Sequence, residues 1–249
     1  MTKRYKSVEW IPGYLPVQQK MFGTAIRAAL SNASDFDGDV LSLVDATAGT
    51  GGRLGGEATT VDIAINEIVS REAQGSTNLV LIERSLDSCT ELLGRIKESG
   101  VPCQIHPCDY REAIPAIVRE DIHGLLYMDL CQGLPYSLLK SLSEVEIDVD
   151  TVIHFSASKC KSGGQQLYNN LMSLGFRVMR ISPAHLNTQW MFMYLSMHAR
   201  PGVIRCMKEA GFLTAKEDSG RLRPLFRKSE MPEWLLPINT VAVRGNSPF

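Results

Sequence analysis

The sequence alternates short runs of apolar and β-branched residues with longer stretches of helical periodicity. We predict strands at the apolar runs 40–44, 79–82, 102–106, 124–128 and 151–155. We predict helices at 15–30, 58–72, 86–98, 111–119, 136–145 and 165–174. A strand, a helix and a further strand in this order need a crossover connection, which makes the strands parallel and places helices on the faces of the sheet. The alternation therefore predicts an α/β fold.

The pattern changes after Gly175, where we predict two strands, 176–181 and 190–196, with a short connection between them. That connection is too short for a helical crossover, so the last strand should be antiparallel. The predicted fold is Rossmann-like, with a mostly parallel seven-stranded sheet, an antiparallel last strand and helices on both faces. The predicted domain organisation is an N-terminal helical segment, a main domain and a C-terminal extension that packs on the same domain, at 1–38, 39–199 and 200–249.

Composition restricts the function classes. The formal net charge of −1 gives no global basic field that would indicate nucleic acid or an anionic membrane, although a local groove can still be basic. No apolar run approaches the ~18–20 residues that span a bilayer, and the basic N-terminus does not lead into an apolar signal region. The 6 cysteines are scattered without metal-ligand spacing, so we expect reduced thiols, no metal site and a cytoplasmic protein that does not bind a membrane.

Acidic residues follow four of the predicted strands: Asp45, Glu83, Asp109 and Asp129. Open α/β sheets bind ligands at the carboxyl ends of their strands, near the point where the strand order reverses. We therefore expect these side chains to share one edge of the sheet. Gly49 and Gly51 follow the first strand and remove side chains where the backbone could approach a ligand closely. Carboxylates beside such a bend suit a cationic ligand that carries several hydrogen-bond donors.

The pattern Asp-x-x-x-Gly-x-Gly at 45–51 resembles the first motif of class I S-adenosylmethionine (SAM)-dependent methyltransferases, and the later acids fall in the order of that family's later motifs. The resemblance covers about residues 40–196 and implies a methyltransferase fold with SAM as the cofactor. It implies that Asp45 faces the ammonium group of the methionine moiety, Glu83 accepts both ribose hydroxyls and Asp109 accepts from the adenine amino group. The implied cofactor-binding residues are Asp45, Ala46, Thr47, Gly49, Gly51, Glu83, Asp109, Tyr110 and Asp129.

Two features set this chain apart from the simplest form of the motif. The separation between Gly51 and Glu83 exceeds the ~20 residues expected between the glycines and the ribose-binding acid, and we assign the excess to a loop before the helix at 58–72. The extended glycine loop, together with Asp129 and a glycine shortly after it, is loosely similar to the three-Cys-motif partner family of predicted methyltransferases. A nicotinamide dinucleotide is the weaker alternative, because Leu54 stands where the third glycine of a dinucleotide fingerprint belongs.

The catalytic group of such an enzyme is expected after the fourth strand, where Asp129 and Cys131 lie. The segment Asp129-Leu130-Cys131-Gln132 lacks the prolines and the adjacent aromatic residue of enzymes that methylate exocyclic amino groups. Cys131 resembles in position the nucleophile of pyrimidine C5 methyltransferases. The other interpretation is that Cys131 is a small apolar residue that lines the pocket.

These features predict a SAM-dependent methyltransferase, with nucleic acid slightly favoured as the substrate over a small molecule or a protein. Lys159 and Lys161 follow the fifth strand and could meet a phosphate, and the basic stretch 221–228 could contact nucleic acid, although solvated surface segments explain each of them as well. We interpret His154, in an apolar strand, as a hydrogen-bonded core histidine. The alternative function is a non-catalytic SAM-binding or protein-interaction module with a degenerate catalytic motif.

Overall fold

The structure is a computed structural model in which eight strands of the described residues form one sheet, in the order β3-β2-β1-β4-β5-β7-β6-β8. The described residues are 14–36, 39–50, 58–117, 122–130, 136–144, 148–156, 170–176, 178–183, 190–198, 200–209 and 213–214. The strands are β1 (Leu41–Asp45), β2 (Thr77–Ile82), β3 (Cys103–His106), β4 (His123–Leu130), β5 (Asp148–Ser156), β6 (Val178–Pro183), β7 (Trp190–Ser196) and β8 (Leu213–Thr214).

The directions of the strands confirm the predicted topology. Strands β1 to β5 are parallel, and β7 runs antiparallel to both of its neighbours, β5 and β6. The strand order reverses between β1 and β4, which pair directly although β2 and β3 separate them in the sequence. This reversal is the switch point at which open α/β sheets bind their ligands.

The sheet carries one strand more than the seven predicted. The additional strand, β8, has only 2 residues and pairs antiparallel with β6. Two residues are too few to show the period-two alternation that identifies a strand, so the sequence contains no pattern for it. The C-terminal extension therefore contributes to the edge of the sheet.

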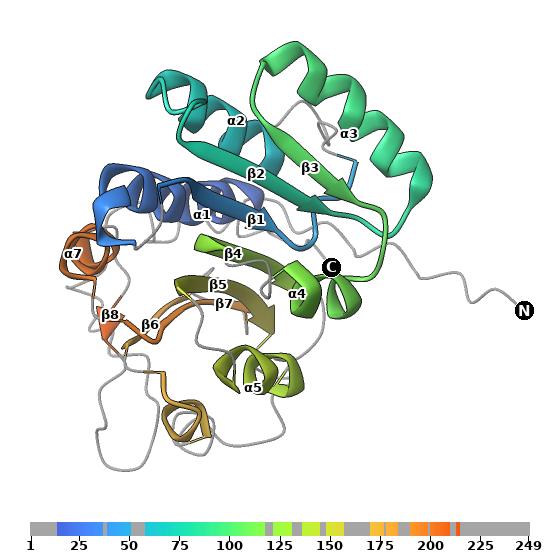
Figure 1. Ribbon diagram of the computed structural model, residues 1–249. Helices are drawn as coiled ribbons and strands as arrows, with labels where there is room; N and C mark the ends of the chain where they lie inside the picture. Colours follow the sequence, from blue (N-terminus) through green and yellow to red (C-terminus); the bar gives the residue numbers. More distant parts are fainter. Residues whose placement is uncertain are drawn as a thin grey trace, which may run out of the picture.

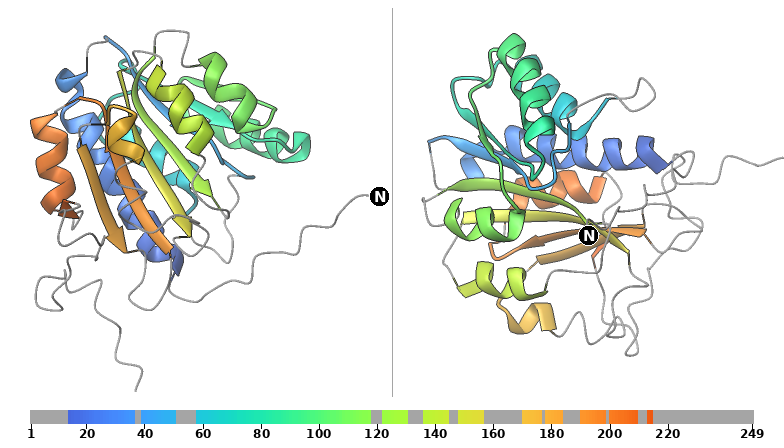
Figure 2. Two further views of the ribbon diagram at one scale, coloured as in Figure 1. Left: turned by 90° about the horizontal axis from the view of Figure 1, so that it is seen from below. Right: turned by 90° about the vertical axis from the view of Figure 1, so that its right-hand side faces the viewer.

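Helices cover both faces of the sheet, as predicted (Figures 1 and 2). In Figure 1, α1 and α2 lie on one side of β4, and α4 and α5 lie on the other. The helices of the described residues are α1 (Tyr14–Ser31), η1 (Ala33–Asp35), α2 (Thr60–Ser70), α3 (Leu86–Ser99), α4 (Tyr110–Ile117), α5 (Tyr136–Glu144) and α7 (Pro201–Glu209). Residues 170–173 are also helical and belong to the predicted helix 165–174.

Each face of the sheet has its own hydrophobic core. One core joins alternate strand residues to α1, α2, α3 and α7, and the other joins the intervening residues to α4 and α5. In β1, for example, Leu43 belongs to the first core and Val44 to the second. Burial on both faces explains why the parallel strands are nearly continuous apolar runs rather than alternating ones.

The chain before and after the main domain packs into the first of these cores. Met21 and Ile26 of α1 and Val203 and Met207 of α7 are fully buried in it. The predicted domain boundaries at 38/39 and 199/200 stay predictions. None of the helices in the described part of the chain is long and apolar enough to cross a membrane.

The helices that follow β1 and β2 begin at the carboxyl edge of the sheet with side-chain caps. Thr59 and Asp62 form a capping box at the start of α2, in which each side chain accepts from the backbone amide of the other residue. Ser85 caps α3 by accepting from the Ser88 amide. These caps orient the N-termini of α2 and α3 toward the strand ends that carry the acidic residues.

Candidate functional site

The four predicted acids lie at one edge of the sheet, at or just after the carboxyl ends of β1 to β4. Asp45 ends β1 and is in register with Leu81 of β2 and Tyr127 of β4. The parallel register brings the remaining strand ends to the same edge. We call Asp45, Glu83, Asp109 and Asp129 the acidic edge.

Asp45 is a buried carboxylate whose hydrogen-bond partners among the described residues are all uncharged. Its exposed fraction is 2%. Its Oδ1 accepts from the backbone amide of Thr47 at 2.9 Å, and its Oδ2 accepts from the hydroxyl of Thr60, the first residue of α2, at 2.6 Å. Burial raises the pKa of Asp45 to about 6, and these hydrogen bonds offset only part of that effect. The nearby charge of Glu83 raises the pKa further. At neutral pH the side chain is about nine-tenths ionised.

Glu83 lies directly beside the glycine bend, although it is 34 positions from Gly49. The Gly49 amide donates to Glu83 Oε2 at 3.0 Å, and the Ser85 amide donates to Oε1 at 2.7 Å. Gly49 has a φ of 63°, and a β-carbon built on it would meet no atom of the described residues within 4 Å. The long separation arises because α2 begins only at Thr60, and it does not displace Glu83 from the bend.

Thr47 connects the ends of β1 and β4 across the switch point. Its Oγ1 accepts from the backbone amide of Asp129 at 2.9 Å. The same hydroxyl donates to Asp45 Oδ1 at 3.4 Å. The Thr47 side chain therefore connects Asp45 to the backbone of Asp129, and Thr47 lies between two residues of the predicted site.

His154 contacts Asp129 from the neighbouring strand. The two residues are paired in register, and His154 Nδ1 lies 2.6 Å from Asp129 Oδ1. His154 is fully buried, and its ring packs on Phe192 with 4.6 Å between ring centroids. Burial lowers the pKa of His154 to about 3, so the ring is neutral at neutral pH. Because an ionised carboxylate only accepts, Nδ1 carries the proton and donates it to Asp129.

The prediction that His154 is a hydrogen-bonded core histidine is confirmed, but the sequence did not identify its partner. Strand periodicity places His154 on one face of β5, and it does not give the register between β4 and β5. That register alone pairs His154 with Asp129.

Asp109 and Tyr110 form the start of α4. The Oδ1 of Asp109 accepts from the Arg111 amide at 2.9 Å, and its backbone oxygen accepts from the Glu112 amide at 2.9 Å. The Arg111 guanidinium lies over the Tyr110 ring, 5.3 Å from its centroid. The Asp109 side chain thus begins a helix, and both it and the Tyr110 ring remain partly exposed at the acidic edge. Ala46, by contrast, is buried, with 3% exposed.

Several predicted functional residues lie outside the described part of the chain. They are Gly51, Cys131, Lys159, Lys161 and the stretch 221–228. Their proposed roles stay predictions.

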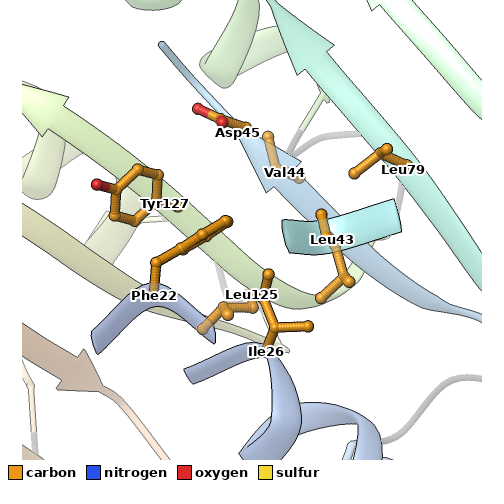
Figure 3. Close-up of a pocket in the computed structure, with 9 residues that line it drawn as sticks. Phe22, Ile26, Leu43, Val44, Asp45, Leu79, Leu125 and Tyr127 are labelled. Carbon is orange, nitrogen blue, oxygen red and sulfur yellow. The ribbon is translucent and has the colours of Figure 1, made fainter. Parts of the chain in front are cut away.

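A small cavity lies under the acidic edge, between α1 and the sheet (Figure 3). Apolar side chains line most of it, including Phe22, Ile26 and Leu79. The volume of this cavity is about 10 Å³, whereas ligand pockets measure ~300–1,000 Å³. The carboxyl group of Asp45 points away from these side chains (Figure 3). This cavity is a packing defect of the core and is too small for an adenosyl group.

A second polar cluster lies at the opposite, amino edge of the sheet. Arg200, which is 3% exposed, pairs with Asp150 at 3.1 Å between Nε and Oδ2 and also pairs with Asp148. The hydroxyls of Tyr194 and Ser196 each donate to Asp150 at 2.5 Å. We call these residues the Arg200 cluster.

In the Arg200 cluster one guanidinium pairs with two carboxylates, those of Asp150 and Asp148. Burial raises the pKa of Asp150, and the charge of Arg200 acts against that rise. For Arg200 itself, burial lowers the pKa of the guanidinium, but its pairs with Asp150 and Asp148 outweigh burial and raise that pKa. Arg200 also donates to the backbone oxygen of Asp35 and lies over the ring of Phe36, 3.9 Å from its centroid. The cluster thereby ties the ends of β5 and β7 to the segment after α1.

Comparison with solved structures identifies the fold. A Legionella pneumophila protein of the DUF519 family superposes with a TM-score of 0.58 at 13% identity, over 80% of this chain and 92% of that one. The strand order and the antiparallel β7 of this chain support the same assignment. The chain has the Rossmann-like fold of class I SAM-dependent methyltransferases. This methyltransferase fold is the one predicted from the sequence, whereas the narrower resemblance to the three-Cys-motif partner family stays a prediction.

More distant likenesses include two Streptococcus thermophilus proteins. A methyltransferase subunit of a type I restriction-modification system has a TM-score of 0.49 at 15% identity, over 77% of this chain and 45% of that one. An rRNA methylase has a TM-score of 0.42 at 14% identity, over 76% of this chain and 98% of that one. No protein-family model matches the sequence, and no curated protein matches it either.

Proposed function

We propose that this protein is a SAM-dependent methyltransferase. The observation that carries the proposal is Asp45, a buried carboxylate held by uncharged donors, beside Glu83 and the open bend at Gly49. Burying a carboxylate is unfavourable unless a positive charge is near it, and the described residues place no cation beside Asp45. A ligand that brings a positive charge to this edge would balance it.

The chemistry of the acidic edge fits SAM. SAM presents an ammonium group, two ribose hydroxyls and an adenine amino group, all of which donate, and a positively charged sulfonium. Each oxygen of Glu83 accepts one backbone amide and keeps one lone pair, enough for the two ribose hydroxyls. Asp45 would attract the ammonium group directly or through water, and Asp109 would accept from the adenine amino group.

The remaining predicted cofactor residues would shape the binding surface. The side-chain-free bend at Gly49 leaves room for the ligand, and we propose that Gly51 extends it. We propose further that Thr47 holds the bend to β4, and that Ala46 and Tyr110 bound the methionine and adenine ends.

Asp129 is the residue that we propose to act on the methyl acceptor. When bound, SAM supplies an electrophilic methyl group, and transfer is mainly a matter of placing the acceptor in line with it. Asp129 lies at the end of β4 with 31% of its side chain exposed. Its carboxylate would orient the acceptor by accepting a hydrogen bond and would take a proton where the acceptor carries one. Cys131, two residues further on, is retained as a candidate nucleophile.

Nucleic acid is the acceptor class that we propose first. The proposal rests on the sequence, in which Lys159, Lys161 and the basic stretch 221–228 could contact phosphates. We expect DNA or RNA to accept the methyl group, and we expect no transfer to protein or to small molecules.

Two measurements on the full chain test the function. Isothermal titration with SAM should give saturable binding, and tritiated SAM should label one fraction among bulk DNA, bulk RNA and lysate protein. Glu83→Gln should weaken SAM binding by about 10–100-fold, because charge-assisted hydrogen bonds contribute about 1.5–3 kcal/mol. Glu91→Gln is the matched control, since Glu91 is exposed on α3. A wild-type protein that does not bind SAM would overturn the proposal. Binding without transfer to any fraction would favour the non-catalytic module.

A further inference from the structure

Asp129 is held at two points by residues of the strands on either side of it. Thr47, just after β1, accepts from its backbone amide at 2.9 Å. His154 of β5 donates to its carboxylate at 2.6 Å. The backbone and the side chain of Asp129 are thus held by two different residues.

His154 cannot meet a ligand itself. Its side chain is fully buried, and its ring packs against Phe192. Any effect of His154 on a reaction must therefore be indirect, and its partner at the acidic edge is Asp129.

Burying a histidine at this position in the core is unfavourable unless its ring nitrogens have hydrogen-bond partners. Burying a polar group without a partner costs about 1–3 kcal/mol, and leucine would fill the space without that cost. The hydrogen bond to Asp129 removes the penalty for His154, and the same bond orients the carboxyl group at the sheet edge. Burial keeps the ring uncharged, so the bond orients the carboxyl group without placing a positive charge beside it.

We infer that His154 is a positioning residue that holds the Asp129 carboxylate in one orientation toward the methyl acceptor. The inference rests on the proposed function, because it assigns Asp129 to the acceptor side of that site. Groups that act on a substrate need to be held within about 0.5 Å of their productive position, and the residues behind them provide this. His154 does so from the core, where solvent cannot compete for the hydrogen bond.

Two substitutions at His154 separate a positioning role from a merely structural one. His154→Leu keeps a similar volume and removes the donor, whereas His154→Asn places an amide donor near the position of Nδ1. We expect His154→Leu to bind SAM within about threefold of wild type and to lower kcat about 100-fold, with KM unchanged for the fraction that wild type labels. We expect His154→Asn to recover kcat to within about 10-fold of wild type.

The same two strands offer a matched control. His123 of β4 and Asp148 of β5 form another in-register pair, with 3.2 Å between Nδ1 and Oδ2, at the amino edge. His123→Leu should change kcat less than twofold. Unchanged kcat in His154→Leu, equal kcat losses in the Leu and Asn variants of His154, or an equal loss in His123→Leu would overturn the inference.

A measurement on the resting protein separates this inference from the proposed function. Long-range ¹H–¹⁵N correlation spectra should show His154 with its proton on Nδ1, and Asp129→Ala should shift both ring nitrogens. A proton on Nε2 instead would overturn the inference even if wild type binds SAM and transfers methyl groups. Absence of SAM binding would overturn the function, and the spectra would still decide whether His154 holds Asp129.

Discussion

Asp45 and Asp150 are both buried aspartates on the same face of one sheet, and they differ in what balances their charge. Asp150, at the amino edge, is 0% exposed and paired with Arg200. Asp45, at the carboxyl edge, is 2% exposed and is held by two threonines through a hydroxyl and an amide. Burial raises the pKa of both carboxyl groups. Asp150 has a cation of the protein beside it, whereas Asp45 has none among the described residues, and we propose that a ligand supplies one.

This contrast separates charges that hold the fold together from charges that serve a ligand. A buried acid with its own cation stabilises the fold only while both partners are present. A buried acid with uncharged partners lowers stability at neutral pH and gains from a cationic ligand. Substitutions at the two edges should therefore have opposite consequences.

The largest effect should come from Arg200→Met. Removing the guanidinium leaves Asp150 buried without its cation and takes one partner from Asp148, so the free energy of unfolding should fall by about 3–5 kcal/mol. Urea denaturation measures the change. Arg205→Met, at an exposed position on α7, is the control and should stay within about 0.5 kcal/mol of wild type.

A second substitution sharpens this prediction. Asp150→Asn in the Arg200→Met background should restore part of the lost stability, because it removes the charge that is left without its cation. A loss below about 1 kcal/mol in Arg200→Met would show that the cluster is not structural, and the contrast between the edges would fail.

Asp45→Asn should change stability in the opposite direction and weaken SAM binding. The pKa of about 6 in the folded protein lies above the ordinary value of 3.8, so the folded state prefers the protonated form. The stability lost through the raised pKa of Asp45 therefore builds up between about pH 4 and pH 6, and it reaches at most about 3 kcal/mol above pH 6. Asparagine avoids that cost but loses charge-assisted hydrogen bonds, so we expect a net gain of about 1–2 kcal/mol at pH 7.

Urea denaturation at several pH values and SAM titration check this prediction. The stability difference between Asp45→Asn and wild type should shrink as the pH falls from 7 to 4, and the dissociation constant for SAM at pH 7 should rise about 10–100-fold. Asp39→Asn, at an exposed position before β1, should change neither quantity. A destabilised Asp45→Asn protein would mean that the carboxylate is as structural as Asp150.

The smallest effect should distinguish two glycines with similar backbones. Gly49 and Gly100 have φ values of 63° and 69°, and a β-carbon on either would meet no atom of the described residues within 4 Å. Gly49→Ala and Gly100→Ala should each lower the free energy of unfolding by about 1 kcal/mol, because alanine is strained at positive φ. SAM titration should show about 10-fold weaker binding for Gly49→Ala. Gly100→Ala should leave SAM affinity unchanged, because Gly100 lies at the C-terminal end of α3. Equal effects on binding would remove Gly49 from the site.

Local periodicity gave most of the fold. The predicted strand 190–196 has the bounds of β7, and the predicted helix 15–30 matches Tyr14–Ser31 within one residue at each end. Such elements are visible because their apolar spacing repeats within the element itself. The strand β8 has no such repeat, and it forms only because β6 provides an edge for it.

The candidate site was predicted in part, and the missing contacts are long-range. The acids at strand ends are visible because each follows an apolar run. The contacts of Glu83 with Gly49 and of His154 with Asp129 depend on how strands pair, which the sequence does not state. The Arg200 cluster was missed for the same reason, because Asp35, Asp150 and Arg200 come from distant segments.

One glycine far from the acidic edge fixes its geometry. Gly124 faces Ser42 where β4 pairs with β1, its φ is 146°, and a β-carbon there would lie 2.1 Å from the Ser42 carbonyl oxygen. Any other residue would push the two strands apart, and the displacement would travel along them to the contact between Thr47 and Asp129. We therefore expect evolution to keep glycine at position 124, because a side chain there would disturb the acidic edge from the opposite end of the strand.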